Sequence, residues 1–304
     1  MKKLLVILLA VFAINVLSIP ETAIAQDKKV IKVKSKEEAE KLKAEQEKEV
    51  AYKKSLNAAN ELYRVGKYSE AIKKYKESIS LNSDNPKAYY GLGLCYSKLN
   101  QFSNAIDNFQ KSIQQDKSFW KAYYGLGNAY LKINKFNEAI NAYVAASKIE
   151  NYYKIYYQIG YVYYKKNNHA KAAEYYKMAV DVKPNYDKGW LNLAASYLEL
   201  KNYSAAVNAA NRALKYLKKR NDKAKANYLL GEAYLNLNQL SNAKSAFQEV
   251  LNLVSSGFYY GGANFGLGVI AKKSGQKTIA KSHFQKALSS SAWRAKAEYE
   301  LKRI

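Results

Sequence analysis

The sequence contains very few of the residues that build disulfides, metal sites and catalytic centres. Its 304 residues include one cysteine, Cys95, and two histidines, His169 and His283. One cysteine cannot form an internal disulfide, and we expect Cys95 to be a small, buried apolar side chain on a helix. One thiol and two scattered imidazoles do not make a metal site, and no HExxH, CxxC, GxSxG or glycine-rich phosphate motif occurs. We therefore predict a protein that is not an enzyme and that binds no metal or cofactor.

Long apolar runs are also scarce, and the one present lies at the N-terminus. Two lysines precede an apolar run over residues 4–17, and an A-x-A site ends at Ala25. This order is typical of a secretory signal peptide. We predict a signal peptide at residues 1–25, cleavage after Ala25, and export to the periplasm or the exterior of a bacterium. The alternative is an uncleaved membrane anchor. No cysteine follows the run, which excludes a lipoprotein anchor.

Acidic residues are half as frequent as basic ones. The chain has 25 Asp and Glu against 50 Lys and Arg, which gives a formal net charge of +25. Such a surplus attracts anions, among them acidic proteins, anionic membrane surfaces and polyanions of the cell envelope. The predicted export argues against nucleic acid as the partner.

Residues 26–51 form a segment rich in Lys and Glu with few apolar side chains. Ser35 and Glu38 have the spacing of a capping box, which predicts that a helix begins at Ser35. Because this helix can bury little apolar surface, we expect a solvated, charged leader helix.

The sequence does contain a repeat. The segment Tyr-Tyr-Gly-Leu-Gly at residues 89–93 returns 34 residues later at residues 123–127. A tyrosine, an aromatic residue, an alanine and a second aromatic residue follow each copy at the same offsets. A fixed period of this length predicts one supersecondary unit stacked many times, with each unit burying the apolar face of the next.

The residues at the repeated positions indicate which unit this is. The small residue of the first helix is Gly93, Gly127, Gly160, Ala194, Gly231 and Gly268, and the alanine of the second helix is Ala71, Ala105, Ala139, Ala172, Ala206, Ala243 and Ala280. This pattern resembles the tetratricopeptide repeat family, whose unit is a pair of antiparallel helices. The resemblance implies an all-α solenoid of about seven tandem two-helix repeats that form a superhelix. The implied repeats are 52–85, 86–119, 120–152, 153–186, 187–223, 224–260 and 261–294, and a capping helix is expected at residues 295–304.

In this family the inner side of each first helix lines a concave groove that binds partners. Lysine recurs at the second position of the repeats, at Lys53, Lys87, Lys121, Lys154, Lys188 and Lys225. A lysine there faces the positive end of the helix dipole and costs about 0.3–1 kcal/mol, so local stability does not explain the recurrence. Either the lysines are functional or recent duplication copied them.

Tyrosine is abundant on the same face, and the chain has 29 tyrosines in all. Together with the first five of these lysines, the residues that we predict to line the groove are Tyr90, Tyr124, Asn128, Tyr157, Tyr161, Tyr164 and Tyr228. We expect the two histidines to have other roles: His169 replaces a packing aromatic residue, and His283 faces solvent.

Tyrosine rings give rigid contact area and lysines attract acidic residues. We therefore predict an exported scaffold for protein–protein interaction that binds an acidic peptide or protein in this groove. The alternative is a binder of a membrane surface or an envelope polyanion that acts through its general positive charge. The oligomeric state stays open.

Overall fold

The computed structural model describes residues 21–304, with side chains from Ser35 onward. The predicted signal peptide therefore lies outside the described residues, apart from its last five positions. The described part of the chain forms fifteen α-helices and contains no strand, which confirms the all-α prediction. Within that part, no helix is both long enough and apolar enough to cross a bilayer.

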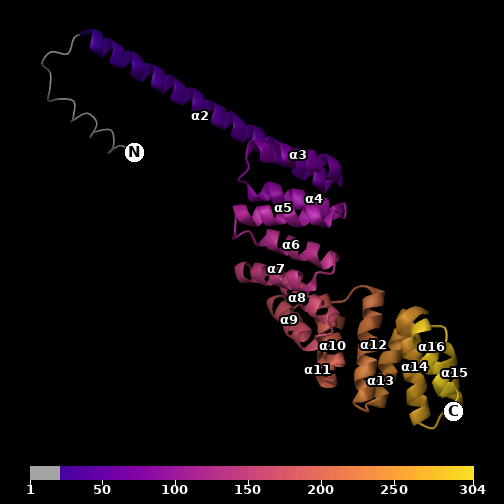
Figure 1. Ribbon diagram of the computed structural model, residues 1–304. Coiled ribbons are helices and arrows are strands. Elements are labelled where there is room, and N and C mark those ends of the chain that lie inside the picture. Colours follow the sequence, from indigo (N-terminus) through magenta and orange to yellow (C-terminus); the bar gives the residue numbers. More distant parts are fainter. Residues whose placement is uncertain (1–20) are drawn as a thin grey trace. The chain divides into compact units, whose positions relative to one another are not determined.

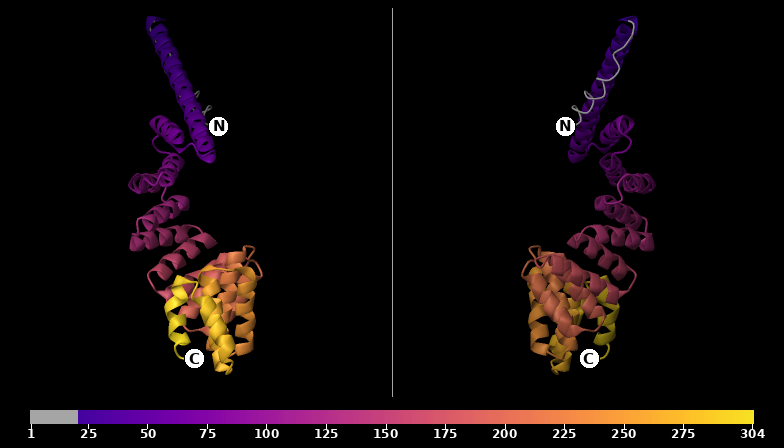
Figure 2. Two further views of the ribbon diagram at one scale, coloured as in Figure 1. Left: turned by 90° about the vertical axis from the view of Figure 1, so that its right-hand side faces the viewer. Right: turned by 90° about the vertical axis from the view of Figure 1, so that its left-hand side faces the viewer.

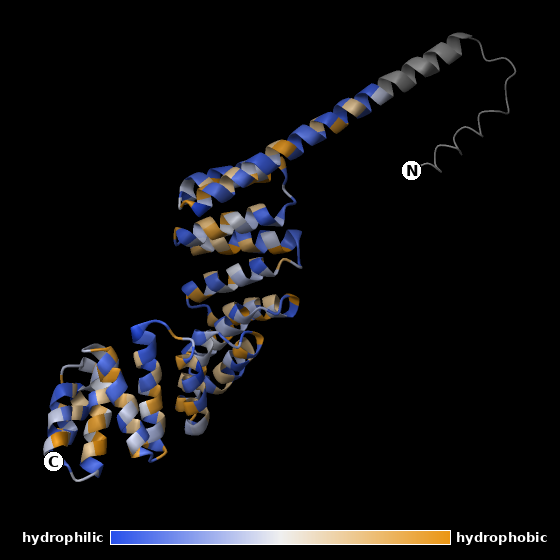
Figure 3. Cartoon of the chain, turned by 180° about the vertical axis from the view of Figure 1, so that it is seen from behind, coloured by the Kyte–Doolittle hydropathy of each residue, from blue (hydrophilic) through white to orange (hydrophobic). Residues whose placement is uncertain are grey.

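The chain divides into two compact units, residues 1–88 and 89–304. In the first unit, α2 (Glu21–Arg64) is one helix of 44 residues that packs against α3 (Tyr68–Leu81). Its residues 35–50 are exposed, and Figure 3 shows this stretch as mostly hydrophilic. The prediction that a helix begins at Ser35 is wrong. No glycine or proline occurs between Glu21 and Ser35, so nothing stops the helix from starting earlier.

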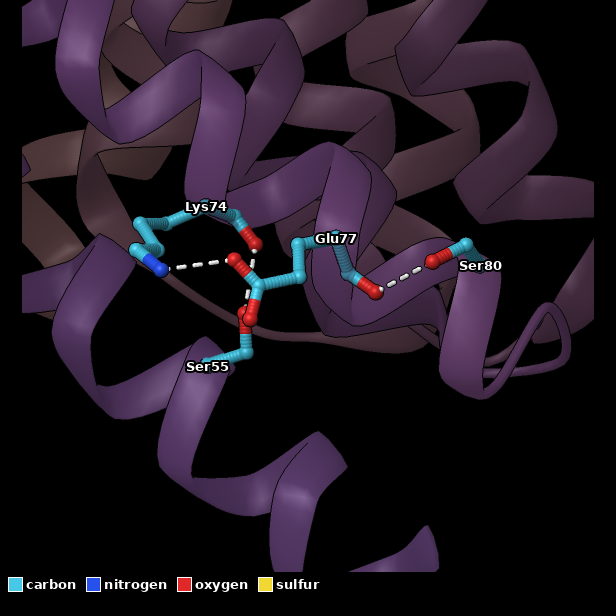
Figure 4. Close-up of polar contacts among 4 residues, drawn as sticks. All are labelled: Ser55, Lys74, Glu77 and Ser80. Carbon is cyan, nitrogen blue, oxygen red and sulfur yellow. Dashed lines mark hydrogen bonds and ion pairs between the residues drawn. The ribbon is translucent and has the colours of Figure 1, made fainter.

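Polar contacts join the two helices of the first unit. The Ser55 hydroxyl donates to the backbone carbonyl of Lys74 at 3.0 Å, and the ammonium of Lys74 lies 2.6 Å from the Glu77 carboxylate (Figure 4). Nearby, the hydroxyl of the buried Tyr75 donates to the Asn60 amide oxygen at 2.7 Å. The bonds of Ser55 and Tyr75 hold the C-terminal end of α2 against α3, whereas the Lys74–Glu77 pair lies within α3.

The second unit consists of antiparallel helix pairs that follow one another as layers (Figures 1 and 2). After α4 (Pro86–Lys98), which begins in the first unit, its helices are α5 (Phe102–Gln115), α6 (Trp120–Lys132), α7 (Phe136–Ile149), α8 (Tyr153–Lys165), α9 (His169–Val182), α10 (Asp187–Glu199), α11 (Tyr203–Leu214), α12 (Arg220–Asn236), α13 (Leu240–Leu253), α14 (Gly257–Lys273), α15 (Lys277–Ala287) and α16 (Ser291–Leu301). From α6 to α15, each helix contacts the next one along the chain, both inside a pair and between pairs.

Close approach of a glycine to an aromatic ring fixes the packing inside most pairs. A Cβ atom built on Gly127 would lie 2.6 Å from the ring of Tyr143, and one built on Gly93 would lie 2.8 Å from the ring of Phe109. The ring of Phe109 also meets Gly125 of the next pair, so one ring fills the space between two layers. Only a residue without a side chain allows helices this close.

The turn inside each pair has a constant geometry. One residue adopts a positive φ, near 58° where it is not glycine; these residues are Asn100, Asn134, Asn167, Lys201 and Asn238, with Gly66 and Gly275 at the same place in the first and last pairs. The next backbone N–H bonds to a carbonyl five residues earlier, as Gln101 does to Tyr96 at 2.9 Å. This is a Schellman motif, which ends a helix cleanly and reverses the chain.

Helix α16 covers the last pair. The Trp293 side chain is buried, and its indole nitrogen donates to the backbone carbonyl of Phe258 at 3.0 Å. An ion pair of 2.6 Å between Lys272 and Glu300 joins α14 to α16. The capping helix expected at residues 295–304 corresponds to α16, which begins earlier, at Ser291, and ends at Leu301.

The rare residues have structural roles. Cys95 is fully buried, as predicted, and burial raises the pKa of its thiol to about 12. The ring of His169 packs edge-on against the ring of Tyr164 at 4.9 Å between centroids, as expected for a packing residue. The prediction that His283 faces solvent is wrong: its ring is half-buried and its Nδ1 lies 3.0 Å from the amide oxygen of Asn264. Asn264 is itself fully buried, so the histidine satisfies a polar group between α14 and α15.

Candidate functional site

Aromatic rings form a row along the N-terminal ends of α6, α8 and α10. Ring centroids are separated by 5.4 Å from Trp120 to Tyr152, by 4.9 Å from Tyr152 to Tyr153, and by 4.7 Å from Tyr153 to Tyr186. The row continues from Tyr186 to Tyr157 at 5.3 Å. All five side chains are half-buried, so each presents part of its surface to solvent. We call these five residues the aromatic row.

Lysine ammonium groups stand over the aromatic row. Lys121 lies 5.8 Å from the Trp120 ring centroid, and Lys154 lies 5.7 and 5.9 Å from those of Tyr152 and Tyr153. Lys183 is closer still, at 4.5 Å from the Tyr153 ring. At these distances the negative faces of the rings attract the cations. A hydrogen bond with Tyr152 raises the pKa of Lys154, so this lysine is charged at neutral pH.

The predicted groove tyrosines differ in how far they are exposed. Tyr228 is 8% exposed and belongs to the core, where its ring meets those of Phe247 and Trp293. Tyr124 and Tyr157 are half-buried, and burial raises the pKa of both hydroxyl groups. Tyr90 packs on the rings of Phe109 and Phe119. These tyrosines hold layers together as well as contributing to the surface.

The predicted asparagine is part of an internal network. The amide oxygen of Asn128 accepts from the hydroxyl of Tyr143 at 2.7 Å and from the side-chain amide of Gln158 at 3.1 Å. Asn128 therefore joins α6, α7 and α8, and its amide oxygen is already used within the fold.

A second polar chain links three first helices. The Asn192 amide on α10 donates to the Tyr157 hydroxyl on α8 at 2.9 Å, and its oxygen accepts from the Lys225 ammonium on α12 at 3.1 Å. This series of hydrogen bonds ends at the Lys225 ammonium group, which lines a pocket.

The pocket lies among α8, α10, α11, α12, α14 and α16, and has a volume of about 650 Å³. Its aromatic lining consists of Tyr164, Tyr203, Tyr228, Phe258, Tyr259 and Trp293. Its charged lining consists of Lys201, Lys225, Lys296, Glu199 and Glu232. We call it the C-terminal pocket.

Burial shifts the pKa of two charged groups of the C-terminal pocket. Desolvation lowers the pKa of Lys225, and the charge of Asp222 opposes this shift only in part. Desolvation raises the pKa of Glu232, while a hydrogen bond with Tyr228 and the charge of Lys296 oppose the rise. Lys296 itself stands 4.8 Å from the centroid of the Trp293 ring. The pocket therefore holds a partly desolvated lysine and a partly desolvated glutamate.

The structure brings the predicted site residues together in two places. Tyr124, Lys154, Tyr157 and Lys121 belong to or adjoin the aromatic row, whereas Tyr164 and Tyr228 line the C-terminal pocket. Tyr161 lies on α8 beneath the ammonium of Lys165, and Lys188 is exposed at the start of α10. Lys53 and Lys87 belong to the first unit, where Lys53 pairs with Glu49 at 3.2 Å.

Sequence reasoning missed several members of both places. Tyr152 and Tyr186 lie just before first helices, outside the positions that define the repeat. Their only signal is that an aromatic residue recurs there at the period of the repeat. Trp293, Phe258 and Lys296 come from the last helices, and no sequence signal places them beside Lys225.

The repeats also match known families. The sequence matches the tetratricopeptide repeat family over residues 86–119, 121–152, 153–186, 187–216 and 224–253, and a TPR repeat description over residues 59–100. No curated protein matches the sequence.

Solved structures with similar folds are also repeat proteins. The C-terminal part of a TPR repeat-containing protein from Cytophaga hutchinsonii is 19% identical, with a TM-score of 0.65, over 81% of this chain and 99% of that one. The protein MamA is 25% identical, with a TM-score of 0.51, over 55% of this chain and 91% of that one. YrrB, described as a TPR protein with an unusual peptide-binding site, is 19% identical, with a TM-score of 0.53, over 59% of this chain and 91% of that one. The helix pairs, the glycine-to-ring packing and the family matches agree, and the chain belongs to the tetratricopeptide repeat family.

Proposed function

We propose that this protein is an exported interaction scaffold that binds an acidic peptide or protein across the aromatic row. Tetratricopeptide repeats with no catalytic family among the matches support a protein–protein interaction scaffold. The observation that carries the finer proposal is the row itself, in which half-exposed rings of Trp120, Tyr152 and Tyr153 lie beneath lysine ammonium groups. Aromatic side chains are the commonest strong anchors of interfaces.

The charge state of the row favours an acidic partner. Among the described residues, no carboxylate lies within ion-pair distance of Lys121, Lys154 or Lys183. The three cations are therefore available to carboxylates of a partner. Rim charges of this kind accelerate association and select partners of opposite charge.

A capture experiment tests this proposal. The immobilised full-length protein is incubated with the extracellular and envelope fractions of its native cells, and bound proteins are identified by mass spectrometry. The double variant Lys121→Glu with Lys154→Glu should lose the specific partner. The matched control, Lys111→Glu with Lys148→Glu, changes the same net charge at exposed positions of the second helices α5 and α7 and should keep it.

Salt separates this proposal from general polyanion binding. Surface charges are screened within about 8 Å at physiological ionic strength, so a polyanion that is held by total charge should dissociate in high salt. If both pairs of reversals weaken capture equally, and all captured material elutes with salt, the proposed site on the aromatic row is wrong.

Export has its own test. The A-x-A site that ends at Ala25 predicts that the mature protein begins at Gln26. N-terminal sequencing of protein recovered outside the cytoplasm should read Gln26 first. Protein that retains Met1 would contradict cleavage and favour the anchored alternative.

A further inference from the structure

The C-terminal pocket contains a cation whose charge is not balanced by a contact. Lys225 donates to one group, the amide oxygen of Asn192, although an ammonium group has three hydrogens to donate. Among the described residues, no carboxylate lies within ion-pair distance of Lys225. A desolvated ammonium with unused donors is costly unless an anion joins it. The pocket is thus suited to receive a negatively charged group.

The same pocket offers a rigid apolar wall. The Phe258 and Trp293 rings lie 5.7 Å apart, Tyr228 lies within 6.2 Å of both, and the indole of Trp293 is fixed by its bond to the Phe258 carbonyl. Rings that are already packed in this way lose little conformational freedom when a ligand binds. A volume of about 650 Å³ falls within the range of ligand pockets.

The remaining charges do not favour a cationic ligand. Three lysines and two glutamates line the pocket, and the carboxyl group of Glu232 is hydrogen-bonded to Tyr228. The lining thus carries one more positive than negative charge, and Lys225 and Lys296 would repel a cation. An anion would meet Lys225 inside the pocket and two exposed lysines at its rim.

We infer that the C-terminal pocket anchors one aromatic side chain of a partner peptide together with an adjacent carboxylate, which pairs with Lys225 and Lys296. This inference rests on the proposed function, in that the occupant is a peptide, but it uses residues of α12, α14 and α16 instead of the aromatic row. The rings select the apolar side chain. The lysines reject peptides without the carboxylate, because these would leave Lys225 desolvated and unpaired.

The test uses a defined probe. The probe is the fluorescein-labelled, C-terminally amidated peptide Gly-Ser-Phe-Asp-Ser-Gly, and its binding to the full-length protein is followed by fluorescence anisotropy. Two further peptides carry Ala in place of Phe or Asn in place of Asp. The protein variants are Lys225→Met, which keeps the length of the side chain, and Lys111→Met as the control, at an exposed position of α5 outside both sites.

The inference predicts a specific pattern of affinities. Lys225→Met should weaken the probe about tenfold or more, whereas Lys111→Met should leave it unchanged. The Asn peptide should lose a similar factor on the parent protein and clearly less on Lys225→Met, where only the contact of the carboxylate with Lys296 remains to be lost. The Ala peptide should lose binding to both proteins. If Lys225→Met does not fold, Lys296→Gln, at an exposed position of α16, replaces it, with a smaller expected loss.

Other outcomes overturn the inference. It is wrong if no peptide binds the parent protein at about 1 mM, the weak end of specific binding. It is also wrong if Lys225→Met and Lys111→Met weaken the probe equally. If 3-phenylpropionate, a free acid with the same groups, binds in a Lys225-dependent manner while the peptides do not, the peptide occupant is wrong. Partner capture that depends on Lys121 and Lys154 would still stand in each case, so the two proposals fail separately.

Discussion

Replacing Gly127 by leucine tests the packing of the helix pairs. A Cβ atom built at this position would lie 2.6 and 2.7 Å from two carbons of the Tyr143 ring. The ring cannot move aside easily, because Tyr143 is fully buried, its hydroxyl bonds to Asn128 at 2.7 Å, and the Tyr124 ring lies 5.6 Å away. A leucine therefore forces α6 and α7 apart or expels the ring.

The expected loss combines three effects. Overpacking of a core by a large side chain costs up to about 3 kcal/mol. Breaking the Tyr143 hydrogen bond adds about 1 kcal/mol. The better helix propensity of leucine offsets about 1 kcal/mol of this loss. The free energy of unfolding should fall by about 2–4 kcal/mol, which corresponds to a melting temperature lower by roughly 4–16 °C for a domain of this size.

Thermal unfolding followed by circular dichroism at 222 nm measures this loss. The control is Lys111→Leu, at an exposed position of α5, which should shift the melting temperature by only a degree or two. If Gly127→Leu melts at the same temperature as the parent protein, the glycine is not at a close helix crossing. The register of the repeats would then be wrong.

Two further predictions concern the turns and pH. Lys201 has a φ of 58° at a position where two other turns have glycine. Lys201→Gly should therefore raise the free energy of unfolding by about 0.5–1 kcal/mol, whereas Lys201→Ala should not. Equal denaturant midpoints for the two variants would contradict this prediction. Burial, and then the charges of Lys286 and Lys244, lower the pKa of His283, so the unfolded chain takes up this proton more readily than the folded one. The stability that this group contributes is present above the ordinary histidine pKa of about 6.5 and falls as the pH drops through that value. In the His283→Gln variant the melting temperature should therefore change less between about pH 7.5 and 5.5 than in the parent protein.

The sequence predicts the repeat unit because the same contact recurs in most layers. Gly93, Gly127 and Gly160 each face a ring of their own second helix, so period and residue type together reveal the contact. The start of the first helix could not be predicted in this way. A capping box at Ser35 signals only that a helix can begin there, and the chain to its N-terminal side is equally able to be helical.

The residues of the candidate sites could be predicted from the sequence only where they recur at the period of the repeat. Lys121 and Lys154 recur at one repeat position, so their common face follows from the period alone. Only part of the aromatic row could be predicted from the sequence. Tyr152 and Tyr186 precede the helices, and their ring contacts depend on the turns between layers.

The C-terminal pocket arises where the repetition ends. Lys225 differs from the other lysines of its row because α16 and the start of α14 fold over this end of the array, and Trp293 and Phe258 enclose it. The same lysine position is exposed in α6, α8 and α10 and desolvated in α12. The residues around Lys225 thus give it a chemical role that the other lysines of the repeat do not have. The period of the sequence does not reveal those surroundings. Whether Lys225→Met alone changes recognition of a carboxylate is therefore the measurement that distinguishes a copied lysine from a functional one.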